Sequence, residues 1–279
     1  MSERQSVWGD SMTVADKQAI AQAFGRAAPH YDDSATLQRR VGHRLIALAE
    51  SEQKQKQKAV RLGTVLDVGC GTGYFTQQWM THAKTVIGLD LSAPMLATAK
   101  ARCDDAMLAV QADAEHLPLA DNSVDLAFSS LALQWCDDLH VPLAELSRVV
   151  KPGGKILVST LLTGSLCELD SAWQQACGTS RVNRFISLSG LQQATQRAGL
   201  MHATVLQESE QLTFANAHAV MKSLKGIGAT YRPQGAGQQG LATRAQFSAV
   251  EKAYQRFALA ANTLPATYQI GYIVIHHHA

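Results

Sequence analysis

Between residues 62 and 160, short apolar runs alternate with longer stretches in which apolar residues recur every three or four positions. The short runs have the length of buried strands, and the longer stretches have the spacing of helices that pack on one face. Runs this apolar are typical of a parallel sheet that helices cover on both sides. We predict strands over residues 64–68, 85–90, 107–111, 124–130 and 155–160.

Helices are predicted between these strands and on both sides of them in sequence. One opens at Ser92, a capping residue, with Pro94 in its first turn, and the Pro-Gly-Gly segment at 152–154 turns the chain into the fifth strand. Helical spacing from residue 16 to about 50 breaks near 28–32. Further helices are predicted over 73–81, 139–150, 167–177 and 189–198, and further strands over 203–208 and 268–275.

The chain divides into three parts. Residues 1–15 have no clear periodicity and are predicted to be disordered. Residues 16–58 are predicted to form an N-terminal helical cap that ends in a stretch rich in Gln and Lys. Residues 62–279 form the main domain, with a helical lid at 215–264 whose middle is rich in glycine. An insertion between the last two strands is a natural place for a lid over a ligand.

Composition narrows the class of protein. The 279 residues are 46% hydrophobic and 17% charged, with a formal net charge of +2, so we expect a large core and no nucleic-acid partner. Five cysteines without a close pair predict neither a disulfide framework nor a zinc site, and we expect no metal. His276, His277 and His278 are expected to extend the last strand rather than bind metal. No apolar stretch reaches 18 residues, so we predict a cytoplasmic monomer without a membrane partner.

The first predicted strand runs into a turn with three alternating glycines, Gly69, Gly71 and Gly73, and Asp67 stands just before them. Glycines at such a turn let the backbone approach a ligand closely. Dinucleotide-binding turns have the spacing G-x-G-x-x-G, so the third glycine comes one residue too early for an NAD enzyme. A carboxylate beside the turn would repel a pyrophosphate but suits a ligand with an ammonium group. Cys70, inside the turn, is interpreted as a packing residue rather than a nucleophile.

Three acids follow the first three strands of the predicted sheet: Asp67, Asp90 and Asp113. Ligands of such sheets bind at the carboxyl ends of the strands, where the strand order reverses. An acid at Asp90 can accept hydrogen bonds from both hydroxyls of a ribose, and one at Asp113 can accept from the amino group of adenine. Met95 and Leu91 are expected to pack on the face of the adenine ring.

Together these residues resemble the class I S-adenosylmethionine methyltransferases over about residues 62–160. The resemblance implies a Rossmann-like α/β fold with a seven-stranded, mostly parallel sheet, helices on both faces and a helical lid. It implies S-adenosyl-L-methionine as cofactor and S-adenosyl-L-homocysteine as product. The implied cofactor-binding residues are Asp67, Gly69, Cys70, Gly71, Asp90, Leu91, Met95, Ala112, Asp113, Ser129 and Leu131.

The flanking segments carry a narrower resemblance. Residues 17–31, 133–136, 183–185 and 221–230 are similar to the malonyl-acyl carrier protein O-methyltransferases of biotin synthesis. That family methylates the free carboxylate of a malonyl group on the phosphopantetheine of acyl carrier protein, which masks a charge on the way to pimelate. A carboxylate is already ionised at neutral pH, so this transfer needs positioning and desolvation rather than a general base.

The acceptor site is predicted from the flanking segments. Tyr31 is expected to cover the methionyl end of the cofactor with its hydroxyl toward the acceptor, and Arg184 to bind the acceptor carboxylate, with Arg26 and Lys17 as other candidates. Phe24 is expected to pack in the lid, and Gln134 and Trp135 to line the methyl-donor pocket.

Two basic groups are candidates for docking the acidic carrier protein, because opposite charge steers association. One consists of Lys222 and Lys225, and the other of Arg39, Arg40 and Arg44. Two other functions stay open at this stage. The chain could methylate another small carboxylate or a quinone, or it could bind S-adenosylmethionine as a sensor without catalysis.

Overall fold

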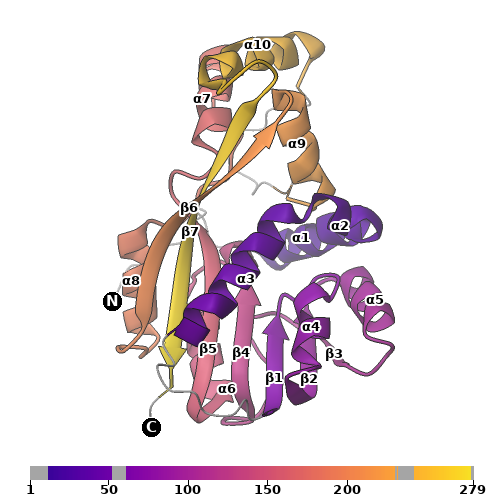
Figure 1. Ribbon diagram of the computed structural model, residues 1–279, viewed down its shortest axis with the longest axis vertical. Helices are drawn as coiled ribbons and strands as arrows, with labels where there is room; N and C mark the ends of the chain where they lie inside the picture. Colours follow the sequence, from indigo (N-terminus) through magenta and orange to yellow (C-terminus); the bar gives the residue numbers. More distant parts are fainter. Residues whose placement is uncertain (1–11, 52–60, 230, 232–241, 278–279) are drawn as a thin grey trace.

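The computed structural model describes residues 12–51, 61–229, 231 and 242–277. Its centre is a seven-stranded sheet with the order β3-β2-β1-β4-β5-β7-β6 (Figure 1). β7 is antiparallel to both neighbours, and the other paired strands are parallel, which confirms the predicted fold class. The strands are β1 (Leu62–Val68), β2 (Ala83–Asp90), β3 (Leu108–Gln111), β4 (Val124–Ser130), β5 (Val150–Leu162), β6 (Thr204–Phe214) and β7 (Leu264–His276).

The strand order reverses between β1 and β4, and this is where the glycine turn lies. Gly73 ends the turn with a φ of +80° and precedes α4 (Tyr74–Trp79). Gly69 has a φ of +71°, and a Cβ added there would lie 2.2 Å from the Cβ of Ala132. The turn therefore needs glycine both for its conformation and for the close approach of the loop that follows β4.

Helices cover both faces of the sheet. On one face, α3 (Thr36–Ser51) buries Leu37, Val41 and Leu45 against the strands, in one hydrophobic cluster with Phe128. The opposite face is covered by α6 (His140–Val149) and α8 (Leu188–Arg197). The remaining α-helices are α1 (Val14–Ala27), α2 (Tyr31–Ser34), α5 (Ala93–Arg102), α7 (Cys167–Cys177), α9 (Ala217–Gly226) and α10 (Arg244–Tyr254).

The last two strands extend beyond the rest of the sheet. β5 pairs with β7 only as far as Gln269, whereas β6 and β7 stay paired as far as Phe214 and Leu264. The predicted strands, 203–208 and 268–275, were therefore too short. This two-stranded extension carries α7, α9 and α10 above the sheet (Figure 1). We call these three helices the lid; α7 packs against α10, although the sequence analysis assigned only 215–264 to the lid.

α1 and α2 lie between the lid and the carboxyl ends of the central strands (Figure 1). A capping box at Thr13 and Asp16 starts α1, two residues earlier than the periodicity predicted. Residues 1–11 of the predicted disordered segment, 52–60 of the Gln/Lys-rich stretch, and 230 and 232–241 of the glycine-rich middle lie outside the described residues. Across the described ranges, no helix combines the length and apolar character that a membrane span needs.

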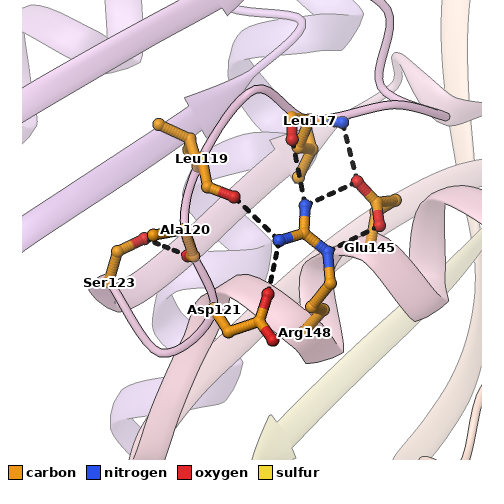
Figure 2. Close-up of polar contacts among 7 residues, drawn as sticks. All are labelled: Leu117, Leu119, Ala120, Asp121, Ser123, Glu145 and Arg148. Carbon is orange, nitrogen blue, oxygen red and sulfur yellow. Dashed lines mark hydrogen bonds and ion pairs between the residues drawn. The ribbon is translucent and has the colours of Figure 1, made fainter.

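The loop between β3 and β4 is held by one arginine of α6 (Figure 2). Arg148 donates hydrogen bonds to the carbonyl oxygens of Leu117 (2.9 Å) and Leu119 (2.7 Å), and to both oxygens of Glu145 at 2.8 Å. It also pairs with Asp121 at 2.7 Å. Because Asp113 lies in the same loop, Arg148 stabilises one wall of the candidate site from outside.

Candidate functional site

Asp67 is the most deeply buried of the three predicted acids, with 2% of its surface exposed. Its Oδ2 accepts a hydrogen bond of 2.6 Å from the hydroxyl of Thr76. The pKa of Asp67 is raised to about 7, chiefly by burial and also by the nearby Asp90, while the Thr76 hydrogen bond opposes the rise. A buried carboxylate of this kind is stabilised by a ligand that brings a positive charge.

Asp90 ends β2 beside the glycine turn. Its two carboxylate oxygens accept hydrogen bonds from the backbone N–H groups of Gly71 (2.9 Å) and Ser92 (2.8 Å). Burial raises the pKa of Asp90, and these N–H groups partly offset that effect. Each oxygen keeps a second lone pair, so Asp90 can still accept hydrogen bonds from ribose hydroxyls as predicted.

Asp113 is joined to the N-terminal cap by an ion pair. Lys17 of α1 reaches across to Asp113 and Glu115, and the backbone N–H of Glu115 donates to Asp113 at 3.0 Å. Burial alone would lower the pKa of Lys17, but the two acids raise it above its ordinary value. The structure therefore places Lys17 at the predicted adenine end, rather than at the acceptor carboxylate where the sequence analysis put it.

Three cavities meet at Tyr31, and two of them are also lined by the glycine turn. The first, of about 110 Å³, is lined by Asp90 and Asp113, and we call it the acid-lined cavity. It includes ten further residues from the predictions: Lys17, Phe24, Tyr31, Gly69, Gly71, Leu91, Met95, Ala112, Leu131 and Trp135. Most of the predicted cofactor residues thus surround one space.

The second cavity, of about 530 Å³, lies under the lid, and we call it the large cavity. It shares Phe24, Tyr31, Leu131 and Trp135 with the acid-lined cavity, so the two spaces adjoin at these four side chains. The rings of Phe24 and Trp135 meet edge to face, with centroids 5.4 Å apart. Most of its other walls are apolar or aromatic side chains, and the lid contributes Leu169, Trp173, Met221, Leu224 and Phe247 to them.

The third cavity, of about 50 Å³, lies on the other side of the turn, and we call it the small cavity. Asp67, Cys70, Gln38 and Arg39 line it, and it shares Gly69, Gly71, Tyr31 and Ser130 with the acid-lined cavity. Cys70 is a free, buried thiol, and burial raises its pKa well above the ordinary value, which agrees with a packing role. Tyr31 lines all three cavities.

Several predicted residues lie elsewhere. Ser129 is fully buried and donates to the carbonyl oxygen of Val68 at 2.9 Å, so it stabilises the strand pair rather than lining the cofactor cavity. Arg26 and Lys222 are exposed and line none of the three cavities. Gln134 donates to the carbonyl oxygen of Leu131 at 2.7 Å and lines the large cavity, as does Lys225.

The placement of Arg184 does not support its predicted role. Arg184 is exposed and lines a separate small space beside Thr160, whereas its neighbours Asn183 and Phe185 line the large cavity. Arg181 lies on the wall of the large cavity instead, with its guanidinium 4.8 Å from the ring centroid of Trp173.

Sequence reasoning also missed Asp32, which joins the cap to the glycine turn. It accepts a hydrogen bond of 2.9 Å from the hydroxyl of Thr72 and pairs with Arg102 of α5 and with Arg39. Although burial opposes the change, Arg102 and Thr72 hold the pKa of Asp32 below its ordinary value. Its position next to Tyr31 in the sequence was the available signal. Among the described residues, no group of three or more His, Cys, Asp or Glu side chains is arranged to hold a metal ion.

The parallel sheet, the three-glycine turn and the acids at the strand ends define a class I S-adenosylmethionine-dependent methyltransferase. Residues 66–158 match the methyltransferase domain family. The fold is shared with geranyl diphosphate methyltransferase, solved with sinefungin (TM-score 0.52, 15% identity, 94% of this chain and 100% of that one). It is also shared with the YcgJ protein of a Bacillus species (TM-score 0.55, 18% identity, 85% of this chain and 99% of that one).

Closer relatives define the family. The chain is 45% identical to the malonyl-[acyl-carrier protein] O-methyltransferase of Yersinia pestis, over 94% of this chain and 92% of that protein. It is 42% identical to the enzyme of the same name from Serratia marcescens, over 94% and 96%. It is 38% identical to the biotin biosynthesis bifunctional protein BioHC of Cellvibrio japonicus, over 99% and 53%. The chain belongs to the malonyl-[acyl-carrier protein] O-methyltransferase family.

Proposed function

We propose that this chain transfers a methyl group from S-adenosyl-L-methionine to the free carboxylate of a malonyl group on acyl carrier protein, in the cytoplasm. The product, a malonyl methyl ester, would prime the synthesis of pimelate for biotin. One observation carries the proposal: the acid-lined cavity and the large cavity adjoin at Phe24, Tyr31, Leu131 and Trp135. A methyl donor in one cavity and a methyl acceptor in the other can therefore meet at the point where these four side chains lie.

The residues at that point fit a transfer that needs no base. S-adenosyl-L-methionine, when bound, supplies the methyl group on a positively charged sulfur and becomes S-adenosyl-L-homocysteine. Burial, with Asp90 and Asp32 nearby, raises the pKa of Tyr31 well above its ordinary value, so the hydroxyl keeps its proton at neutral pH. Tyr31 can then donate a hydrogen bond to an acceptor carboxylate but cannot act as a base. The ionised carboxylate already has the electron pair that forms the new bond.

The large cavity suits such an acceptor. Apolar and aromatic walls exclude water from the carboxylate, and holding two reactants in line lowers a barrier by about 7–11 kcal/mol. Arg181 lies on this wall, so we propose it, ahead of Arg184, as the cation that pairs with the acceptor. Arg181→Met should raise the KM for the acceptor about tenfold or more and leave S-adenosyl-L-homocysteine affinity within about twofold. If Arg184→Ala does this and Arg181→Met does not, the original assignment stands.

The carrier protein is proposed to dock at Lys222 and Lys225 rather than at the arginines of α3. Each of those arginines has an acidic partner: Arg39 pairs with Asp32, Arg40 with Glu210 and Arg44 with Glu208. Lys222 and Lys225 are exposed on α9, and neither has a salt bridge within the part of the chain that the structure describes. Lys225 also lines the large cavity, so this basic pair stands beside the acceptor's space.

The deciding experiment incubates the full chain with methyl-labelled S-adenosylmethionine and, separately, with malonyl-acyl carrier protein, malonyl-CoA and free malonate. We expect label on the carrier-bound malonyl group, released by mild base as expected for a methyl ester. Label on free acids alone would indicate a methyltransferase of small carboxylates. Binding of S-adenosyl-L-homocysteine without transfer to any acceptor would indicate a sensor and refute the proposal.

A further inference from the structure

Two residues that line the small cavity each have a buried polar atom without a hydrogen-bond partner among the described residues, and one of them, Gln38, also lines the large cavity. Nε of Arg39 and Oε1 of Gln38 are both buried, and neither has a hydrogen-bond partner among the described residues. Both side chains line the small cavity together with Asp67. An unpaired donor and an unpaired acceptor in one buried space cost free energy, so such groups are usually satisfied by water or a ligand.

The rest of the Arg39 side chain is held in place. Its Nη2 donates to the carbonyl oxygen of Asp32 at 3.2 Å and lies 3.5 Å from the Asp32 carboxylate. Its guanidinium lies 4.9 Å from the ring centroid of Tyr74. Because Asp32 also pairs with Arg102, the charge of Asp32 is shared between two arginines. Arg39 therefore keeps positive charge and an N–H donor for an anion in the cavity.

The groups of the small cavity match the two ends of an α-amino acid. Arg39 offers a donor for a carboxylate, while Gln38 offers an acceptor for an ammonium group and Asp67 a buried negative charge for it. The cavity joins the acid-lined cavity at Gly69, Gly71, Tyr31 and Ser130. A ligand with an adenosine at one end and an amino acid at the other would thus cross the glycine turn at Tyr31.

We infer that Arg39 binds the carboxylate of the methionyl group of the cofactor and that Gln38 accepts a hydrogen bond from its ammonium group. The inference rests on the cofactor in the proposed function, but not on the acceptor. It removes Arg39 from the basic group considered for carrier docking. The amphipathic pattern of α3 offered a signal, because Gln38 and Arg39 directly follow the buried Leu37.

Two ligands separate this role from a general effect on the site. S-adenosyl-L-homocysteine carries the amino-acid end, whereas 5′-methylthioadenosine keeps the adenosine and the sulfur but lacks both charged groups. The binding of each is measured by calorimetry to the full-length wild-type chain, Arg39→Met and Gln38→Leu. Methionine keeps an apolar stem against Tyr74, and leucine has nearly the shape of glutamine.

We expect Arg39→Met to weaken S-adenosyl-L-homocysteine about 10- to 100-fold and Gln38→Leu to weaken it about 5- to 10-fold, as for lost hydrogen bonds to charged groups. The Kd of 5′-methylthioadenosine should change less than about twofold. Arg40→Met is the matched control, since the exposed neighbour pairs with Glu210 at 3.9 Å and should change neither ligand.

The inference would be overturned if both variants weakened the binding of both ligands equally, or if they weakened the binding of neither. Either result would leave the use of the cofactor intact. If Arg39→Met weakens the binding of both ligands, the result for Gln38→Leu decides. Weaker binding of S-adenosyl-L-homocysteine alone by Gln38→Leu would support the amino-acid site, and an equal effect on both ligands would refute it. A wild-type chain that binds neither ligand would refute the inference together with the proposed function.

Discussion

Replacing Asp67 by asparagine should make the ligand-free protein more stable and the cofactor site weaker. Asp67 is almost completely buried next to the glycine turn, and Thr76 is the group that lowers its pKa. Burial raises that pKa from the ordinary 3.8 to about 7. The folded protein is therefore less stable with an ionised carboxylate at this position than with a neutral group. The negative charge contributes to ligand binding rather than to the stability of the fold.

The sign of the pH dependence follows from the direction of this change. Since the folded pKa lies above the unfolded one, the folded state binds more protons between about pH 4 and 7, and wild-type stability falls as pH rises through that window. The rise in pKa from 3.8 to about 7 corresponds to a loss of about 4 kcal/mol in the free energy of unfolding above pH 7, at 1.36 kcal/mol for each pKa unit. Because burying the asparagine amide also costs free energy, we expect Asp67→Asn to raise the free energy of unfolding by about 1–3 kcal/mol at pH 8.

Urea unfolding of wild type and Asp67→Asn, followed by circular dichroism at pH 5 and pH 8, measures the difference. The gain in free energy of unfolding should shrink at pH 5, where the wild-type carboxyl is protonated in the folded state. Binding of S-adenosyl-L-homocysteine to the wild type should weaken below pH 7, and Asp67→Asn should bind it at least about tenfold more weakly at pH 8. A variant that is no more stable than wild type at pH 8 would refute the reasoning, whatever its affinity.

Three further changes test separate parts of the site. Tyr31→Phe should lower kcat about tenfold or more and leave the Kd of S-adenosyl-L-homocysteine within about twofold; unchanged turnover would remove the hydroxyl from the reaction. Lys222→Glu combined with Lys225→Glu should raise the KM for malonyl-acyl carrier protein and abolish its salt dependence, but spare malonyl-CoA; wild-type turnover that ignores ionic strength would contradict docking by charge. Arg148→Met should lower the free energy of unfolding by about 1–3 kcal/mol in urea titrations without changing kcat, because Arg148 binds the loop from outside (Figure 2). A large fall in kcat with normal stability would show that it acts on the site directly.

The parts of the fold that depend on local sequence were predictable. The strand at 124–130 and the helix at 167–177 have the predicted bounds, and the glycine turn stands where its spacing placed it. Side-chain periodicity and the conformational needs of glycine act over a few residues, so they can be read without knowledge of the fold. The far ends of β6 and β7 were missed because they pair only with each other and carry the lid, a partnership that the sequence does not display.

The destinations of long charged side chains were not predictable in the same way. Lys17 was placed at the acceptor but pairs with Asp113 and Glu115, which are nearly one hundred residues away in sequence. Arg184 was predicted to bind the acceptor and Arg181 was not considered, although of these two only Arg181 lines the large cavity. Arg39 was grouped with the surface arginines, although its Nε is buried. A helix or loop assignment says where a backbone runs, but which cavity a side chain enters is decided by packing between distant elements.

The position of Tyr31 connects the cofactor half of the site with the acceptor half. Tyr31 lines all three cavities, and the cap that carries it is tied to the sheet at two points, through Lys17 to Asp113 and through Asp32 to Thr72 and Arg102. A cofactor bound at the glycine turn would contact the cap at Lys17 and at Tyr31, because both residues line the acid-lined cavity. Since Tyr31 also lines the large cavity, it is a residue that both a cofactor and an acceptor would contact, and a change at Tyr31 can affect both halves of the site.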